Sequence, residues 1–492
     1  MKVREELREL ISAGYPFIYI VSWEENRVEE VLEEFSSSAL GTSPFVWTNT
    51  GGFKRDGNPE EETRSLIQAL DFIVQQEKGF FILKDVHHLF QNPEVIRKFR
   101  DTYFSIRGKP KRVFLLSPIF KLPEELKRHV AVVDYPLPEF QEMLSLVVSF
   151  LKERGEKGTK INLSREDVNQ MAVALQGFTV DEATFALRRV THQRKSLDAG
   201  IIEALKEEKR QIMRKEGVLE YITEKLRLED IGGLDNLKQW LIKRKRAFSP
   251  EARKYGLDVP RGLLVMGITG CGKSIIIKAV STLWELPLFR LDMNLVYSGI
   301  AGLPEEAFIR ALKVVESASP AVLWLDEIES GITDKYTADS TARILGYFLT
   351  WMQEHKEGVF VGATANRIDM LPAELLRRGR FDQIFFVDLP SRKEREEIFR
   401  VHFKKRGIDP DKFNIPQLAQ ITKGWSGAEI EQAIISAMYE AFNQGRPVEE
   451  DDLYKIFTNT VPLSTTMAEQ VKKIRSWAHD RAVRASSEKP EI

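Results

Sequence analysis

One glycine-rich stretch constrains the fold of this chain more than any other feature. Gly267, Gly272, Lys273 and Ser274 occur at the spacing G-x-x-x-x-G-K-S, after an apolar run and before residues 275–277, which are three isoleucines. This order predicts a strand, a loop and a helix. Glycines let a backbone adopt positive φ angles and wrap a polyphosphate with its N–H groups and the following helix N-terminus. We therefore expect an α/β domain organised around this loop.

By itself, the loop predicts a site for a nucleoside triphosphate. Lys273 would reach the β and γ phosphates, and Ser274 would hold Mg²⁺. The alternative is a chance glycine turn before a core helix, which the flanking strand and helix disfavour. The residues expected to bind the nucleotide here are Gly267, Ile268, Thr269, Gly270, Cys271, Gly272, Lys273, Ser274 and Ile275.

Composition limits the remaining possibilities. A chain of 492 residues is expected to form about three structural units. Its content of 43% hydrophobic and 29% charged residues is typical of a soluble globular protein. We expect no membrane span, because no apolar run approaches the roughly 18 residues required. We also expect no cleaved secretory signal, because MKVREELREL has no uninterrupted hydrophobic block. The 72 basic and 73 acidic residues give a net charge of −1, which makes nucleic acid an unlikely partner.

Cys271 is the single cysteine, which excludes an internal disulfide framework and a cysteine-based zinc site and fits a reducing compartment. It lies in the predicted phosphate loop, where backbone N–H groups would favour its thiolate. One interpretation is an oxidation switch on ATP binding. The interpretation we favour is a small side chain at a position that acts through its backbone.

The first third of the chain alternates strand-like and helix-like segments. Strands are predicted over residues 16–22, 79–84 and 112–117, and a helix over residues 27–35. Such alternation favours a parallel sheet with crossover helices. No glycine-rich loop follows the first of these strands, so this region cannot bind phosphates as the central loop would.

Two pairs of segments suggest that the N-terminal third repeats the module containing the loop. The stretch LPEELKRHVAVVDYPLP from Leu122 resembles LPAELLRRGRFDQIFFVDLPS from Leu371, and QGFTVDEATFAL at residues 176–187 resembles KGWSGAEIEQAI at residues 423–434. Both pairs occur in the same order and at a similar spacing. Chance similarity between two generic α/β segments is the alternative.

The segments between and after the two copies predict connecting structure. Residues 204–217 (ALKEEKRQIMRKEG) carry interleaved basic and acidic residues at helical spacing, which favours a solvated linker helix over a contact with nucleic acid. Residues 467–482 predict a closing amphipathic helix. Residues 486–492 (SSEKPEI) predict a frayed tail.

A second motif, AVLWLDEIE at residues 321–329, predicts a buried strand that ends in carboxylates. Asp326 and Glu327 would emerge beside the phosphate loop at the carboxyl edge of the sheet. There Asp326 could hold the Mg²⁺ hydration shell, and Glu327 could polarise an attacking water. The alternative is a strand that is simply capped by acidic residues.

Two further groups complete the candidate catalytic set. A strand over residues 359–363 is followed by Asn366, which could orient the water or sense the γ phosphate, or else only cap a turn. The stretch LLRRGRFD at residues 375–382 contains Arg377 and Arg380. An arginine directed at the transferred phosphoryl group from across an interface accelerates its transfer greatly. A solvated basic patch is the alternative.

These motifs together resemble those of AAA-type ATPases. From Leu228 to the end, the chain is similar to that family in five stretches: LEDIGGLDNLK, YGLDVPRGLLVMGITGCGKS, WLDEIE, ATANRIDMLPAELLRRGRFD and GWSGAEIEQAI. The combination of this module with a loop-less N-terminal copy is similar to the divergent AAA-like proteins encoded in algal plastid genomes and cyanobacteria.

The resemblance implies a fold and a domain division. The fold would be a P-loop AAA module, a parallel sheet with flanking helices and a helical lid, preceded by a degenerate AAA-like α/β domain. The implied domains are a degenerate N-terminal domain, a linker helix, an ATPase large subdomain, and a lid with a C-terminal helix, at residues 1–203, 204–227, 228–392 and 393–492.

The resemblance also implies roles for single residues. Ile231 and Gly232 would line the adenine pocket, and Ala428 of the lid would lie near the nucleotide. Asn366 would be sensor 1, and Arg377 and Arg380 would be arginine fingers that act on the nucleotide of the neighbouring subunit. The implied catalytic residues are Glu327, Lys273, Asn366, Arg377 and Arg380.

The implied activity is Mg²⁺-dependent hydrolysis of ATP by a homo-oligomer, expected to be a hexameric ring. Hydrolysis would drive the remodelling or regulation of an unidentified protein client in a photosynthetic setting, either the cyanobacterial cytoplasm or the plastid stroma. The alternative is a nucleotide-gated regulatory or scaffold protein with little turnover.

The chain departs from the family pattern in two places. At the first pore loop it has Ile300, Ala301 and Gly302, with Tyr297 displaced upstream, so threading of a polypeptide by aromatic side chains is in doubt. In the N-terminal copy, FFILKDV at residues 80–86 resembles the carboxylate-bearing strand, with Asp85 matching Asp326 but Val86 at the place of Glu327. That copy also lacks matching arginines.

The adjacent His87 and His88 would point to opposite faces of a strand. No third metal ligand is evident, so we expect ordinary surface or capping histidines rather than a metal site.

Overall fold

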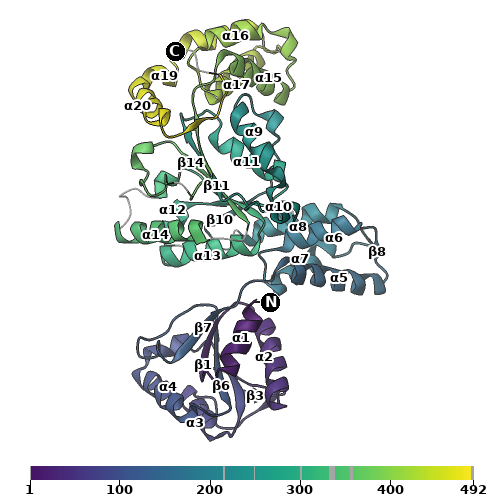
Figure 1. Ribbon diagram of the computed structural model, residues 1–492. Coiled ribbons are helices and arrows are strands. Elements are labelled where there is room, and N and C mark those ends of the chain that lie inside the picture. Colours follow the sequence, from purple (N-terminus) through teal and green to yellow (C-terminus); the bar gives the residue numbers. More distant parts are fainter. Residues whose placement is uncertain are drawn as a thin grey trace. The chain divides into compact units, whose positions relative to one another are not determined.

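The computed structural model describes residues 2–213, 217–248, 250–299, 302–331, 338–354, 358–377 and 379–488. The chain forms two compact units, one of Met1–Leu146 with Phe178–Phe185 and the other of Val147–Gly177 with Ala186–Ile492 (Figure 1). Among the described residues, no helix has the length and apolar character needed to cross a membrane.

The first unit is built on a seven-stranded sheet with the order β4-β3-β2-β5-β6-β1-β7. Five adjacent strands, β2, β5, β6, β1 and β7, are parallel, as the alternating sequence pattern predicts. The strands are β1 (Phe17–Val21), β2 (Phe45–Thr48), β3 (Gly52–Arg55), β4 (Asn58–Pro59), β5 (Gly79–Lys84), β6 (Lys111–Ser117) and β7 (Val130–Asp134).

Alternating side chains of β1 pack on opposite faces of this sheet, so both faces are buried. Phe17 and Tyr19 contribute to the core under α3 (Leu66–Gln75) and α4 (Pro93–Ile106). Ile18 and Ile20 contribute to the core under α1 (Lys2–Ser12) and α2 (Glu25–Leu40). Figure 1 shows helices on both sides of these strands.

A helical segment follows, made of α5 (Phe140–Glu156), α6 (Arg165–Leu175), α7 (Val180–Thr191) and α8 (Gly200–Met213), with the short strands β8 (Lys160–Ile161) and β9 (Ser196–Leu197). Helix α8 covers residues 204–213 of the segment expected to be a solvated linker helix. Its Leu205 and Lys209 are fully buried. The expectation of a solvated linker is therefore wrong for α8, because one face of this charged helix packs against neighbouring elements.

The second unit contains a sheet with the order β10-β12-β13-β14-β11-β15-β16. The strands are β10 (Leu219–Ile222), β11 (Gly262–Gly267), β12 (Leu288–Leu291), β13 (Ala321–Leu325), β14 (Val359–Ala365), β15 (Gln383–Val387) and β16 (Val483–Arg484). β11, β13 and β14 are buried along their whole length, as is typical of central parallel strands. The predicted α/β fold class with a parallel sheet is confirmed.

The two sheets share an arrangement that supports the internal repeat. In the first, the order β2-β5-β6-β1-β7 places the first strand of the chain between β6 and β7. In the second, the order β12-β13-β14-β11-β15 places β11, the strand before the phosphate loop, between β14 and β15. The helices of this second copy include α9 (Asp235–Arg244), α10 (Pro250–Tyr255), α11 (Lys273–Trp284), α12 (Met293–Tyr297), α13 (Pro304–Ser317) and α14 (Ala338–Glu354).

A helical lid follows β15. It consists of α15 (Arg392–Lys405), α16 (Ile415–Ile421), α17 (Gly427–Asn443) and α18 (Glu450–Asn459). Its own core contains Phe399, Phe403, Leu418, Trp425 and Leu453. The chain then forms α19 (Leu463–Thr466) and α20 (Ala468–His479). The boundaries predicted for the four domains stay predictions.

The first residues of the C-terminal tail make defined contacts where the sequence predicts fraying. β16 extends the sheet beside β15, and the buried Ala485 accepts a hydrogen bond from Leu237 N at 3.1 Å. The side chain of Asn236 donates to the carbonyl of Ser486 at 3.1 Å. The prediction of a frayed tail is therefore wrong for residues 486–488, and residues 489–492 lie outside the described part of the chain.

Candidate functional site

The phosphate loop connects β11 to α11 in a conformation that requires glycine. Gly267 and Gly270 have φ angles of 147° and 78°. A Cβ at Gly267 would lie 1.9 Å from the Val387 carbonyl oxygen, and one at Gly270 would lie 3.0 Å from Ser426 Oγ. Side chains at these positions would push the loop away from β15 and from the lid. The two glycines therefore allow the loop to pack closely against both β15 and the lid.

Lys273, the first residue of α11, is buried within the loop. Its ammonium donates to the carbonyl oxygens of Gly267 at 3.0 Å and Ile268 at 2.7 Å. Desolvation lowers its pKa, while the nearby Glu327 and Asp326 act in the opposite direction. The ammonium is therefore held inside the loop, where an anionic ligand would offset the cost of burying its charge.

Ser274 and Asp326 form a pair of oxygen ligands at the carboxyl edge of the sheet. Ser274 Oγ donates to Asp326 Oδ1 at 2.9 Å, and Thr364 Oγ1 donates to the same oxygen at 2.6 Å. A hydroxyl beside a carboxylate suits Mg²⁺, which is bound by few protein oxygens together with phosphate oxygens. The described residues contain no group of three His, Cys, Asp or Glu able to hold a metal. The donor set therefore fits a magnesium nucleotide better than a metal bound by protein alone.

Glu327 and Asn366 also meet at this edge. Asn366 Nδ2 donates to Glu327 Oε1 at 2.7 Å, and Glu327 N donates to Thr364 Oγ1 at 2.9 Å. Glu327 has φ 49°, a left-handed conformation that is strained for glutamate. Adjacent strands β13 and β14 thus hold this carboxylate in one orientation.

Glu329 was not predicted as a site residue, yet it fixes the turn that carries Asn366. Its Oε1 accepts hydrogen bonds from Asn366 N at 2.7 Å and Arg367 N at 3.1 Å. Glu329 is only 5% exposed, and burial raises its pKa. The signal in the sequence is the third carboxylate of the DEIE stretch, and Thr364 offered no comparable signal.

The residues expected near the adenine lie around the loop. The buried Ile231 belongs to the same core cluster as Ile276 of α11. Gly232 packs against α15, since an added Cβ would lie 2.8 Å from Ile398 Cγ1. Ala428 N, in the first turn of α17, donates to the carbonyl of Gly270 at 3.0 Å. The lid therefore contacts the phosphate loop directly.

The two predicted arginine fingers differ in exposure. Arg377 is exposed, whereas Arg380 is 9% exposed and donates from Nη1 to the carbonyl of Glu374. Arg377 borders a groove lined by α9, α10, α20 and the start of β15, rather than by the phosphate loop. Within one chain, then, these arginines do not join the site formed by Lys273 and Glu327. The predicted pore-loop residues Ile300 and Ala301 lie outside the described residues.

The expectation of a favoured thiolate at Cys271 is wrong. Desolvation raises the pKa of its thiol to about 12, and this effect exceeds the opposing effect of the Lys273 charge. Sγ lies 3.8 Å from the Thr269 carbonyl oxygen, and the side chain packs against Ile268, Leu389 and Val471. Cys271 is therefore a protonated, partly buried thiol at neutral pH.

The end of β5 in the first unit corresponds to the end of β13 in the second. Its backbone shows that the predicted match of Asp85 to Asp326 is wrong. Asp85 has φ 54° and precedes the 3₁₀ helix η1 (Val86–Gln91), just as Glu327 precedes η5 (Ile328–Gly331). This backbone feature matches Asp85 to Glu327 and Lys84 to Asp326. A lysine thus stands at the place of the predicted Mg²⁺ ligand.

Lys84 forms ion pairs with Glu25 at 2.9 Å and with Glu29, both on α2, the helix that corresponds to α11. The histidines that follow lie on η1 and not on a strand. His87 is buried, with Nδ1 2.7 Å from Ser117 Oγ, so the expectation of a surface histidine is wrong for this residue.

Family models match four parts of the chain. "SpoVK-like AAA ATPase, N-terminal domain" matches residues 3–135, and the second domain of the same kind matches residues 140–216. "ATPase family associated with various cellular activities (AAA)" matches residues 263–389, and "AAA+ lid domain" matches residues 412–455.

Curated relatives extend the similarity to the whole chain. The AAA domain-containing protein ycf46 of Pyropia yezoensis is 36% identical over 497 residues, covering 99% of this chain and 100% of that protein. Its counterpart in Trieres chinensis is 35% identical, covering 99% of each chain. A cell division cycle protein 48 homolog of Archaeoglobus fulgidus is 30% identical over 56% of this chain and 41% of its own length.

Proposed function

The chain belongs to the AAA family of ATPases and is similar over its whole length to the ycf46 proteins of algal plastid genomes, and we propose that it hydrolyses ATP with Mg²⁺ as a homo-oligomer. The observation that carries this proposal is the pair of contacts at the carboxyl edge of the second sheet. Ser274 meets Asp326 at 2.9 Å, and Asn366 meets Glu327 at 2.7 Å. One pair supplies ligands for a metal, and the other supplies an oriented base.

In the proposed reaction, Glu327 accepts a proton from the water that attacks the γ phosphate. Asn366 holds the Glu327 carboxylate through its amide, and Lys273 neutralises charge on the phosphates. Bound Mg²⁺ would stabilise the charge that develops on the phosphate oxygens, with Ser274 and Asp326 as its protein ligands.

The neighbouring subunit would complete the site. The exposure of Arg377 makes it available to another copy of the chain, whereas Arg380 is turned toward the Glu374 carbonyl. Arg377 is therefore our candidate for the arginine that acts in trans, and Arg380 is assigned to supporting its turn. A hexameric ring, as expected from the family, would bring each Arg377 to the next phosphate loop.

Each subunit should bind one ATP. In the first unit, Lys84 stands at the place of a metal ligand and is paired with Glu25 and Glu29, and the sequence after β1 contains no glycine-rich loop for phosphates. We propose that hydrolysis moves the lid and so remodels or regulates a protein client in the plastid or cyanobacterial cell. The competing proposal is a nucleotide-gated scaffold with little turnover.

Phosphate release by the purified protein separates these two proposals. Wild type should turn over ATP, and Glu327→Gln should bind ATP without hydrolysing it. Glu354→Gln, which removes an exposed carboxylate at the end of α14, is the matched control and should behave as wild type. Equal, slow release by wild type and Glu327→Gln would exclude the hydrolase and leave the scaffold.

A further inference from the structure

The segment Ile231–Leu234 begins with the two residues expected to line the adenine, Ile231 and Gly232, and its backbone is bound to the lid by two glutamate side chains. Gly233 N donates to Glu397 Oε2 at 2.8 Å, and Leu234 N donates to Glu394 Oε1 at 3.1 Å. Both glutamates lie on α15, the first helix of the lid. The segment's backbone therefore depends on side chains located about 160 positions later in the chain.

The two glycines of the segment permit this contact. A Cβ on Gly233 would lie 2.3 Å from Glu394 Oε1, and a Cβ on Gly232 would lie 2.9 Å from Ile398 N. Any larger residue would separate the segment from α15. Leu234 adopts φ 61°, a conformation that is costly for leucine, and its N–H is one of the groups held by α15.

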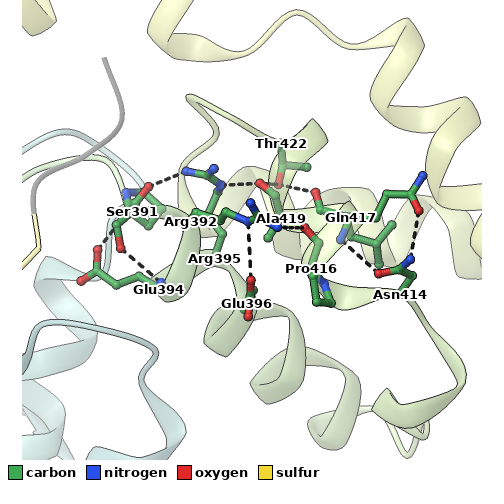
Figure 2. A network of polar contacts seen from close by, with 12 residues as sticks. Ser391, Arg392, Glu394, Arg395, Glu396, Asn414, Pro416, Gln417, Ala419 and Thr422 are labelled. Carbon is green, nitrogen blue, oxygen red and sulfur yellow. Dashed lines mark hydrogen bonds and ion pairs between the residues drawn. The ribbon is translucent and has the colours of Figure 1, made fainter.

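Glu394 also belongs to the cap of α15, so the contact reaches the lid's own framework. Its Oε2 accepts a hydrogen bond from Ser391 N at 2.8 Å, and Ser391 Oγ accepts one from Glu394 N at 3.3 Å. The neighbouring Arg395 is 1% exposed and donates to the Ala419 carbonyl of α16 at 2.8 Å. Figure 2 shows this series of contacts from Ser391 through Arg395 to Ala419.

The lid meets the site at a second point. Ala428 N donates to the Gly270 carbonyl at 3.0 Å, so α17 rests on the phosphate loop while α15 holds the adenine-side segment. A rotation of the lid that leaves its own core intact would alter both contacts together.

We propose that Glu394 and Glu397 are positioning residues that couple the base of the nucleotide to the orientation of the lid. This proposal rests on the proposed nucleotide site, which it deepens by assigning base recognition to the backbone that these carboxylates hold. The carboxylates act through the segment and do not touch the nucleotide. Phosphate binding by the loop should not depend on them.

The test compares ligands with and without a base. In Glu394→Ala and Glu397→Ala, we expect ATP affinity to fall about tenfold for each lost charged hydrogen bond. The affinity for inorganic tripolyphosphate should remain within about twofold of wild type, since its binding requires only the loop. Glu396→Ala, on the same helix and paired with Arg392, is the matched control.

Gly233→Ala, alone and combined with Glu394→Ala, distinguishes a specific loss of the contact from misfolding of the variant. Gly233→Ala should weaken ATP binding through its clash with Glu394, and adding Glu394→Ala should remove that clash. The double variant should therefore bind ATP no more weakly than Gly233→Ala alone, while the φ of 71° keeps alanine strained in both variants. Hydrogen exchange should show that ATP protects α15 and α16 in wild type but not in Glu394→Ala.

The outcomes separate this proposal from the one on which it rests. If wild type binds neither ATP nor tripolyphosphate, the nucleotide site itself is wrong. If wild type binds both and the glutamate variants keep wild-type ATP affinity, the positioning role is wrong while the site stands. An equal loss of affinity for ATP and tripolyphosphate would also overturn the positioning role, because it would show a general disruption of the loop.

Discussion

The side-chain amide of Asn366 donates to Oε1 of Glu327 at 2.7 Å, across the adjacent strands β14 and β13. Glu329 fixes the turn that carries Asn366, because its Oε1 accepts hydrogen bonds from the backbone N–H groups of Asn366 and Arg367. Asn366 thus orients Glu327, the proposed base, and Glu329 in turn fixes the backbone of Asn366. Orientation of this kind matters most in the transition state and little for binding of the ground state.

Asn366→Ala should therefore lower kcat by about 10²-fold while the dissociation constant for ATP stays within about twofold. The reason is that Glu327 would remain but lose the group that orients it. Steady-state phosphate release and equilibrium binding of a fluorescent ATP analogue would measure the two quantities. A parallel loss of affinity would mean that Asn366 contributes to binding instead.

Arg377→Ala should reduce turnover by about 10³-fold or more, because the charge acting in trans would be missing. Mixing this variant with Glu327→Gln should recover part of the activity. In mixed assemblies, the intact base of one variant can meet the intact arginine of the other. Arg107→Ala, an exposed arginine of the first unit, is the control and should need no rescue. No recovery on mixing would argue against an arginine acting between subunits.

Lys209 should make the stability of the second unit depend on pH. It is fully buried, donates to the Gln176 carbonyl at 2.6 Å and lies 5.2 Å from the ring centroids of Tyr221 and Phe289. Desolvation lowers its pKa from 10.5 to about 7. Tyr221, with its pKa raised to about 12, stays neutral over this range.

The unfolded chain therefore binds one more proton than the folded chain between pH 7 and pH 10.5, so stability should rise with pH over this interval. Thermal unfolding midpoints of wild type relative to Lys209→Met should increase from pH 7 to pH 9. The control Lys225→Met, which removes an exposed lysine, should show no such trend. A flat difference for Lys209→Met would show that this lysine keeps an ordinary pKa.

Cys271 should react slowly with alkylating reagents at neutral pH, because its pKa of about 12 leaves almost no thiolate. As the single cysteine, it can be followed by mass spectrometry of the whole protein. Cys271→Ala should keep most of the ATPase activity, since the position acts through its backbone. Complete labelling within minutes at pH 7.5 would revive the oxidation-switch interpretation.

Much of the fold could be predicted because β11, β13 and β14 are continuous apolar runs bounded by polar residues. Ser274, Asp326, Glu327 and Asn366 could be placed together because each follows or ends such a strand at one edge of the sheet. The contacts among them in the structure agree with that placement.

Features that depend on distant contacts could not be predicted. Glu394 and Glu397 look like surface residues of an amphipathic helix until α15 packs on the Gly232–Gly233 backbone. The charge of Lys209 and the polarity of the tail after Ala485 predict exposure to solvent. The sequence does not reveal the elements that cover Lys209 and Ala485 in the folded chain. The raised pKa of the Cys271 thiol could not be predicted from the sequence, because it depends on a desolvation effect that outweighs the effect of the Lys273 charge.

The most direct test of an ATPase site completed between subunits is the specific activity of phosphate release as a function of protein concentration. The account predicts that activity per subunit rises with concentration, reaches a plateau as oligomers form, and is abolished throughout by Glu327→Gln. A specific activity that stays constant down to concentrations at which light scattering shows only monomers, or that equals that of Glu327→Gln, would contradict it.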